Sequence, residues 1–124
     1  MKKIIEQLKI GERYFGSGGH NSPEFNKFFN SFKKVFKKEL ETIGATDFEA
    51  GKGHFYLSGF FRLGEQLFYF SISDVRHGLG FDRSGQPKML VRTAQHNKDW
   101  TGDSNNYVEI KEGIAEEIQR TFRL

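Results

Sequence analysis

The chain lacks the residues on which several kinds of small protein depend. It has no cysteine, which excludes a disulfide scaffold, a zinc site with thiolate ligands and a thiol nucleophile. Its four histidines have none of the close spacings found in metal-binding motifs, so we expect no metal and no other cofactor. No apolar run approaches the length of a membrane span, and the first residues lack the apolar core of a signal peptide. We therefore expect a cytoplasmic protein that does not enter a membrane.

Phenylalanine, in contrast, is abundant and accounts for 14 of the 124 residues. Because aromatic rings bury a large area per residue, they let a chain of this length build one modest core. The sequence has no internal repeat and no low-complexity segment, so we expect residues 1–124 to form a single α+β domain. The net charge of +3 is weak for a nucleic-acid-binding protein, although the middle of the chain is more basic than its end.

A long amphipathic helix is the clearest element of the sequence. Ser22 has the character of a helix cap, and Pro23 suits the first helical position. Apolar residues then recur at helical spacing: Phe25, Phe28, Phe29, Phe32, Val35, Phe36, Leu40 and Ile43. Lysines lie on the opposite face: Lys27, Lys34 and Lys38. Gly44 ends this helix; we expect its Phe stripe in the core and its lysines either solvated or in contact with an acidic partner.

Strands are predicted after this helix, over residues 46–50, 54–63, 66–75 and 88–94. The dipeptide Gly64-Glu65 suits a two-residue hairpin turn, which pairs Phe61 with Phe68. A shorter helix is expected over residues 1–10. Together these elements predict an α+β fold, in which an antiparallel sheet of about four strands packs against the Phe-rich helix, with a C-terminal helix.

The end of the chain allows two interpretations. Apolar side chains recur every four residues and predict a helix: Ile110, Ile114, Ile118 and Phe122. On this interpretation Asn106 and Glu109 occupy the positions of a capping box, and the polar loop before them joins a strand to a helix. Residues 107–110 also have the alternation of a short strand, in which case the helix begins near Lys111.

The second face of the predicted hairpin combines aromatic and basic side chains: Tyr56, Phe60, Arg62 and Tyr69. Single-stranded nucleic acids stack on platforms of this kind. Together with Lys27, Lys34 and Lys38, this face makes a nucleic-acid-binding module one alternative for the function. The competing interpretation is that another helix covers the same face, because a domain of this size can cover both sides of its sheet.

A polar loop with the single Trp of the chain follows the last predicted strand. Its residues suited to contact a partner protein are His96, Lys98, Asp99, Trp100 and Thr101. Tryptophan is enriched among the residues that dominate binding energy at interfaces, which favours a contact role for this loop. The alternative is that Trp100 folds back over the core as a plug.

A metal-dependent nuclease is a second alternative. Glu109, Ile110 and Lys111 have the Glu-x-Lys form that occurs in some metal nucleases. Such a site also needs a partner carboxylate, and Asp99 and Asp103 would serve poorly from a loop. No other catalytic set stands out in the sequence, so we expect a protein that is not an enzyme.

The C-terminal half resembles a known group of proteins. Residues 68–76, FYFSISDVR, and residues 90–94, LVRTA, together with the KDWTGDSNNYV segment, resemble small proteins of bacterial phages and mobile elements. The resemblance implies a short binding protein, of a kind that includes inhibitors of host defence such as anti-CRISPR proteins, and it carries over no catalytic residue. We therefore expect a non-enzymatic protein that acts by protein–protein contact.

Overall fold

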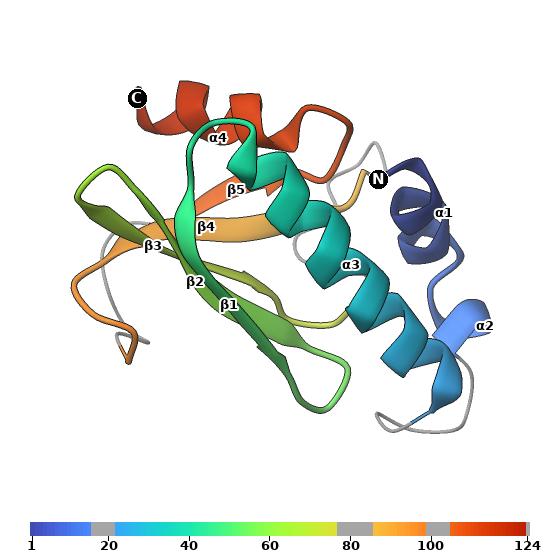
Figure 1. Cartoon of the computed structure of the whole chain (residues 1–124). Helices are drawn as coiled ribbons and strands as arrows, with labels where there is room; N and C mark the ends of the chain where they lie inside the picture. Colours follow the sequence, from blue (N-terminus) through green and yellow to red (C-terminus); the bar gives the residue numbers. More distant parts are fainter. Residues whose placement is uncertain (16–21, 77–85, 99–104, 124) are drawn as a thin grey trace.

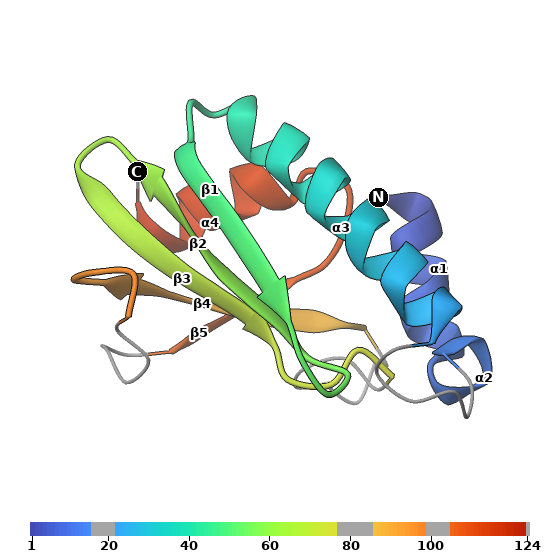
Figure 2. The same cartoon turned by 60° about the horizontal axis from the view of Figure 1, so that its bottom comes forward.

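The computed structural model describes residues 1–15, 22–76, 86–98 and 105–123. In this part of the chain the helices pack against one face of a five-stranded antiparallel sheet, and a common core lies between them (Figures 1 and 2). The predicted α+β fold is confirmed, with five strands in place of about four. Over the same ranges, no helix is both long and apolar enough to cross a membrane.

The described residues form four helices: α1 (Lys2–Ile10), α2 (Glu12–Phe15), α3 (Pro23–Glu41) and α4 (Ile114–Phe122). The helix predicted over residues 1–10 is α1, and Gly11 ends it with a φ of 61°. The start of α3 is where the sequence predicts it, because the Ser22 hydroxyl accepts a hydrogen bond of 3.1 Å from the backbone N–H of Phe25. The helix ends at Glu41, and Gly44 follows it with a φ of 86°.

The strands of the sheet are arranged in the order in which they occur in the chain, and each pairs antiparallel with its neighbour. They are β1 (Thr46–Lys52), β2 (Leu57–Leu63), β3 (Gln66–Ile72), β4 (Lys88–Ala94) and β5 (Asn106–Glu109). The predicted hairpin register is confirmed, because Phe61 pairs with Phe68 across the turn between β2 and β3. Gly64 opens that turn with a φ of 61°, a value that favours glycine.

The short strand β5 decides between the two interpretations of the chain end. Asn106 and Glu109 belong to this strand and pair with β4, so the capping-box prediction is wrong. The N-cap of α4 is Gly113, which makes no side-chain cap hydrogen bond. The strand prevails because β4 offers its backbone groups to residues 106–109, and pairing satisfies both sets. The polar loop before Asn106 therefore joins two neighbouring strands and not, as predicted, a strand and a helix.

Phenylalanine rings fill the space between α3 and the sheet. The most deeply placed residues of α3 are at most 7% exposed: Phe25, Phe28, Phe29, Phe32, Phe36 and Leu40. Phe36 packs edge-on against Phe61 of β2 and Phe70 of β3, with ring centroids 6.2 and 5.0 Å away. The prediction that the Phe stripe is core is confirmed, and Val35 and Ile43 are half-buried at its margin.

Gly59, in the middle of β2, allows β1 and a core ring to approach it closely. A Cβ atom at this position would lie 2.0 Å from the backbone oxygen of Glu49 and 2.8 Å from the ring of Phe70. Gly51 on β1, in contrast, has nothing within 4 Å of the corresponding position. The tight contact between β1, β2 and Phe70 therefore depends on glycine at position 59.

Candidate functional site

The sheet face that points away from the Phe core carries tyrosines and serines. We call it the Tyr–Ser face and define it by Tyr56, Ser58, Tyr69, Ser71, Ser73 and Tyr107. The strand registers place these residues on one side, since Ser58 pairs with Ser71, and Leu90 pairs with both Ser71 and Tyr107. Two of its rings, Tyr56 and Tyr107, are 45% and 53% exposed. This face therefore presents large aromatic surface to solvent on a rigid sheet.

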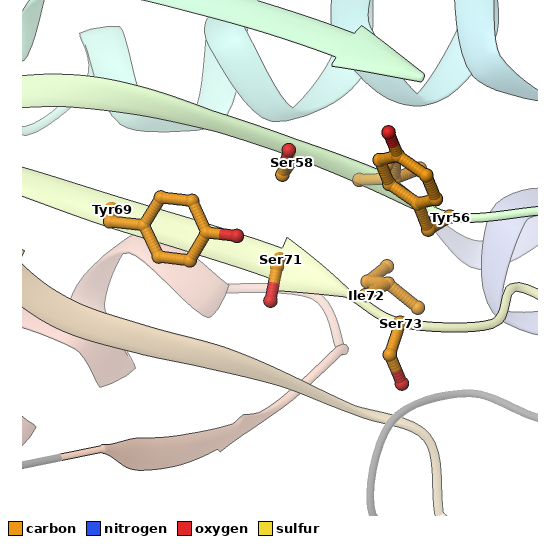
Figure 3. Close-up of a pocket in the computed structure, with 7 residues that line it drawn as sticks. Tyr56, Ser58, Tyr69, Ser71, Ile72 and Ser73 are labelled. Atoms are coloured by element: carbon orange, nitrogen blue, oxygen red, sulfur yellow. The ribbon is translucent and has the colours of Figure 1, made fainter. Parts of the chain in front are cut away.

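An open pocket of about 460 Å³ lies on this face (Figure 3). Hydroxyl-bearing side chains line it: Tyr56, Ser58, Tyr69, Ser71 and Ser73. Leu57 and Ile72 complete the lining with apolar surface. Because a hydroxyl group both donates and accepts hydrogen bonds, the pocket offers adaptable polar contacts beside two aromatic rings.

The position of the Tyr56 ring depends on a glycine. Gly53 donates a backbone hydrogen bond of 3.0 Å to the carbonyl oxygen of Tyr56, which brings the two residues opposite each other. A Cβ atom on Gly53 would lie 2.2 Å from the Tyr56 ring. The absence of a side chain at position 53 therefore leaves the space in which this ring lies.

Two residues of the predicted nucleic-acid platform have other roles in the fold. Phe60 is only 3% exposed and packs with Leu67, Ala94 and Tyr69 in a small cluster on the second face. Arg62 forms an ion pair with Asp47 on β1, with 3.2 Å between Nε and Oδ2, and it also donates a hydrogen bond to the carbonyl oxygen of Glu65. Of the four predicted platform residues, the structure brings Tyr56 and Tyr69 together at the pocket.

The cation that stacks on this face is Arg92, which the sequence did not single out. Its guanidinium carbon lies 4.4 Å from the centre of the Tyr69 ring, and Nη1 donates to the carbonyl oxygen of Thr93. Arg92 is only 2% exposed, so its charge is withdrawn from the surface. Arg92 reaches this ring because it pairs with Tyr69 across β3 and β4. No short turn joins these two strands, so the sequence does not predict their register.

The predicted lysine face lies on the other side of the molecule. Lys27, Lys34 and Lys38 are exposed on α3, whose opposite side packs its Phe stripe onto the core face of the sheet. Figures 1 and 2 show α3 on that side of the sheet. The two parts of the nucleic-acid alternative therefore do not form one continuous surface.

The predicted partner-contact loop is described only at its beginning. His96 and Lys98 follow β4 directly, are exposed, and are linked by a hydrogen bond of 3.1 Å from the Lys98 backbone N–H to His96 Nδ1. Asp99, Trp100 and Thr101 lie outside the described residues. Their role as partner contacts, and the alternative of Trp100 as a plug, therefore stay predictions.

The Glu-x-Lys segment is held by ion pairs. Lys111 Nζ lies 3.9 Å from Glu109 Oε2 and 3.5 Å from Glu117 Oε2. Within the described ranges no group of three or more His, Asp or Glu side chains is placed to hold a metal ion, and Asp99 and Asp103 fall outside those ranges. The residues that are described thus give the metal-nuclease alternative no assembled site.

Comparisons of the chain with protein-family models, with curated proteins and with solved structures found no match. The chemistry of the described surfaces is therefore the basis on which a function can be inferred.

Proposed function

We propose that this chain is a small binding protein that contacts a partner protein through its Tyr–Ser face. The observation that carries the proposal is one open pocket lined by Tyr56, Tyr69 and three Ser hydroxyls, with the exposed Tyr107 ring on the same sheet face. Tyrosine supplies rigid, amphipathic contact area at a low cost in conformational entropy, and serine supplies adaptable hydrogen bonds. Antibody paratopes use the same pair of residues for the same physical reasons.

The charges around this face favour a protein over a nucleic acid. Nucleic-acid affinity depends mainly on Lys and Arg side chains that are available to phosphates. Here Arg62 is paired with Asp47, Arg92 is buried against Tyr69, and Lys88 lies opposite Glu109 in the register of β4 and β5. These basic side chains already have acidic or aromatic neighbours within the fold. The groups that the face mainly offers to a partner are therefore hydroxyl groups and aromatic rings.

We further propose that the chain originates from a phage or mobile element. The resemblance of residues 68–76 and 90–94 supports a protein of a phage or mobile element that inhibits a host-defence system by occupying the surface of a defence protein. Such an inhibitor acts in the bacterial cytoplasm, where the defence protein is located. Expression of the chain in bacterial strains that carry different defence systems tests this part, since an inhibitor restores phage plaques on at least one of them.

Capture of partners from a bacterial lysate tests the role of the Tyr–Ser face. The immobilised chain is compared with the double variant Tyr56→Ser/Tyr107→Ser, which removes the two exposed rings. We expect the variant to lose the captured protein, because Tyr is enriched among the few central interface residues whose loss costs about 2 kcal/mol or more.

Two controls make the experiment specific. The double variant Lys27→Gln/Lys38→Gln alters the other side of the molecule and is expected to capture the same protein as the unaltered chain. Treatment of the lysate with nuclease is expected to leave capture unchanged. Capture that depends on nucleic acid contradicts the proposal and favours the nucleic-acid module. Capture that survives loss of both tyrosines contradicts it and favours another surface, such as the polar loop that follows β4.

A further inference from the structure

A second surface lies between α3 and the outer edge of the sheet. β1 is the terminal strand at this side, with β2 as its neighbour. A groove of about 360 Å³ runs between its residues Phe48, Glu49 and Ala50 and the lysines Lys33, Lys34 and Lys37 of α3. Figures 1 and 2 show the strand and the helix alongside each other. The groove thus has a strand edge on one side and a row of cations on the other.

The edge of β1 offers backbone groups to an added strand. The hydrogen bond from the Gly53 N–H to the Tyr56 carbonyl marks a hydrogen-bonded pair at the end of the β1–β2 ladder. Since such pairs alternate with non-bonded ones, Ala50 and Lys52 direct their N–H and C=O groups to the outer edge. An extended peptide laid along this edge satisfies both kinds of group, as in β-strand addition.

A β-bulge limits the length of edge that is regular. The β1–β2 register shifts between Thr46 and Glu49, and Asp47 within the shift has a φ of 53°. Regular pairing therefore runs from Glu49 to Lys52, next to the groove. The bulge blunts the first part of the edge, which restricts strand addition to the segment that faces the lysines.

The charges of the groove select an acidic occupant. Lys33, Lys34 and Lys37 are exposed, whereas Glu49 is the one carboxylate among the groove residues described above. The nearby Asp47 is already paired with Arg62. The floor is apolar, because the ring of Phe48 packs against Phe36 and Phe70 and is only half-buried. The groove is therefore positive along its helical wall and apolar at its base.

We propose that this groove binds an extended acidic segment of a partner protein, which joins the sheet as a sixth strand beside β1 and directs its carboxylates to Lys33, Lys34 and Lys37. A nucleic acid shares the negative charge but lacks the alternating amide groups that match Ala50 and Lys52. The surface is separate from the Tyr–Ser face, so the two proposals can fail independently.

Fluorescence anisotropy with synthetic peptides tests the mode of binding. The probe is a labelled octapeptide of alternating Glu and Val, and the matched control alternates Lys and Val. We expect the Glu–Val peptide to bind and the Lys–Val peptide not to bind. Two further Glu–Val peptides carry N-methyl groups on alternate amides. In one peptide every Glu amide is methylated, and in the other every Val amide is methylated. Because one set of amides faces β1 and the other faces solvent, we expect one methylated peptide to bind at least about tenfold more weakly than the other.

Protein variants locate the site. The double variant Lys33→Gln/Lys37→Gln is expected to lower the affinity for the Glu–Val peptide about fivefold at low salt, which corresponds to the loss of two exposed ion pairs. The control Lys3→Gln/Lys9→Gln removes two exposed lysines of α1 and is expected to have no effect. Tyr56→Ser/Tyr107→Ser is also expected to have no effect, which separates this groove from the Tyr–Ser face. Thermal melting monitored by circular dichroism verifies that each variant is folded.

Several results overturn the proposal. Failure of the Glu–Val peptide to bind excludes the groove as an acidic-peptide site. Equal affinities of the two methylated peptides show that no strand is added, and equal weakening by the two lysine variants shows that binding is not local. Displacement of the peptide by a single-stranded oligonucleotide at equal concentration identifies a site for phosphates instead.

Discussion

The two faces of the sheet are built from the same strands but with different aromatic residues. On β3, Phe70 points into the core and is fully buried, whereas its neighbour Tyr69 lies on the other face and is half-buried. The core face meets α3 with edge-on Phe rings and stacks Phe61 on Phe68 within the sheet, and the other face surrounds a pocket with hydroxyl groups. Alternation along a strand thus separates the residues that stabilise the fold from those that are available for recognition.

The comparison implies that substitutions of similar size have unequal effects on the two faces. A ring removed from the core leaves a cavity among rings that cannot fill it, and this adds to the lost burial. A ring removed from the open face leaves water in its place. The free energy of unfolding should therefore fall steeply for core substitutions and little for those on the Tyr–Ser face.

Phe36→Ala is expected to have the largest effect. Phe36 is fully buried and has ring contacts with Phe32, Phe48, Phe61 and Phe70. Its loss should lower the free energy of unfolding by about 3–5 kcal/mol, measured by urea denaturation. A loss below about 1 kcal/mol would contradict the core assignment, since surface substitutions already reach about half that value.

Gly59→Ala is expected to have the second largest effect, and it tests how closely β1 and the Phe70 ring approach β2. The added methyl group collides with the backbone oxygen of Glu49 and with the Phe70 ring, and backbone atoms cannot yield as a side chain can. We expect a loss of about 2–3 kcal/mol by the same measurement. Gly51→Ala is the matched control on the neighbouring strand, where the methyl group has open space. Equal losses for the two variants would show that the crowding at Gly59 is not the cause.

Gly53→Ala should reposition a ring of the Tyr–Ser face with little loss of stability. The new methyl group displaces the far end of the Tyr56 side chain, which can rotate away. We expect a change in the free energy of unfolding of about 1 kcal/mol or less, together with weaker partner capture. Full partner capture by a variant in which NMR shows that the Tyr56 ring has moved would mean that this ring takes no part in recognition.

Tyr56→Ser/Tyr107→Ser is expected to have the smallest effect on stability. Both rings are about half exposed, so the double replacement should change the free energy of unfolding by about 0.5 kcal/mol or less in total. Urea denaturation at neutral pH measures the change. A loss comparable to that of Phe36→Ala would erase the distinction between the two faces.

The parts of the fold that were predicted correctly carry local signals. The Phe stripe of α3 repeats at helical spacing after the cap at Ser22, and Gly64-Glu65 sets the register of one hairpin without help from distant residues. The end of the chain allowed a strand or a helix over residues 107–110. Pairing with β4 makes residues 106–109 a strand, and pairing between segments that are distant in sequence has no local signature.

The candidate site was predicted only in part for the same reason. Tyr56 and Tyr69 follow from alternation along the hairpin. The capture of Arg62 by Asp47 depends on the bulged register of β1, and the stacking of Arg92 on Tyr69 depends on the register of β3 and β4. A long connection separates those last two strands, so their register cannot be obtained from the length of a turn.

The order of the strands in the sheet also has a consequence for how the protein folds. Each described strand pairs with the next one in the chain, so the sheet can grow strand by strand. The connections from β1 to β2 and from β2 to β3 are short, and the longer connections that follow add little chain entropy cost, because loop-closure entropy grows slowly with length. We expect refolding on the order of milliseconds in stopped-flow circular dichroism; a dominant phase of minutes would contradict this. During synthesis, β2, β3, β4 and β5 each emerge beside a strand that is already available, which shortens the time that unpaired strand edges are exposed to other chains.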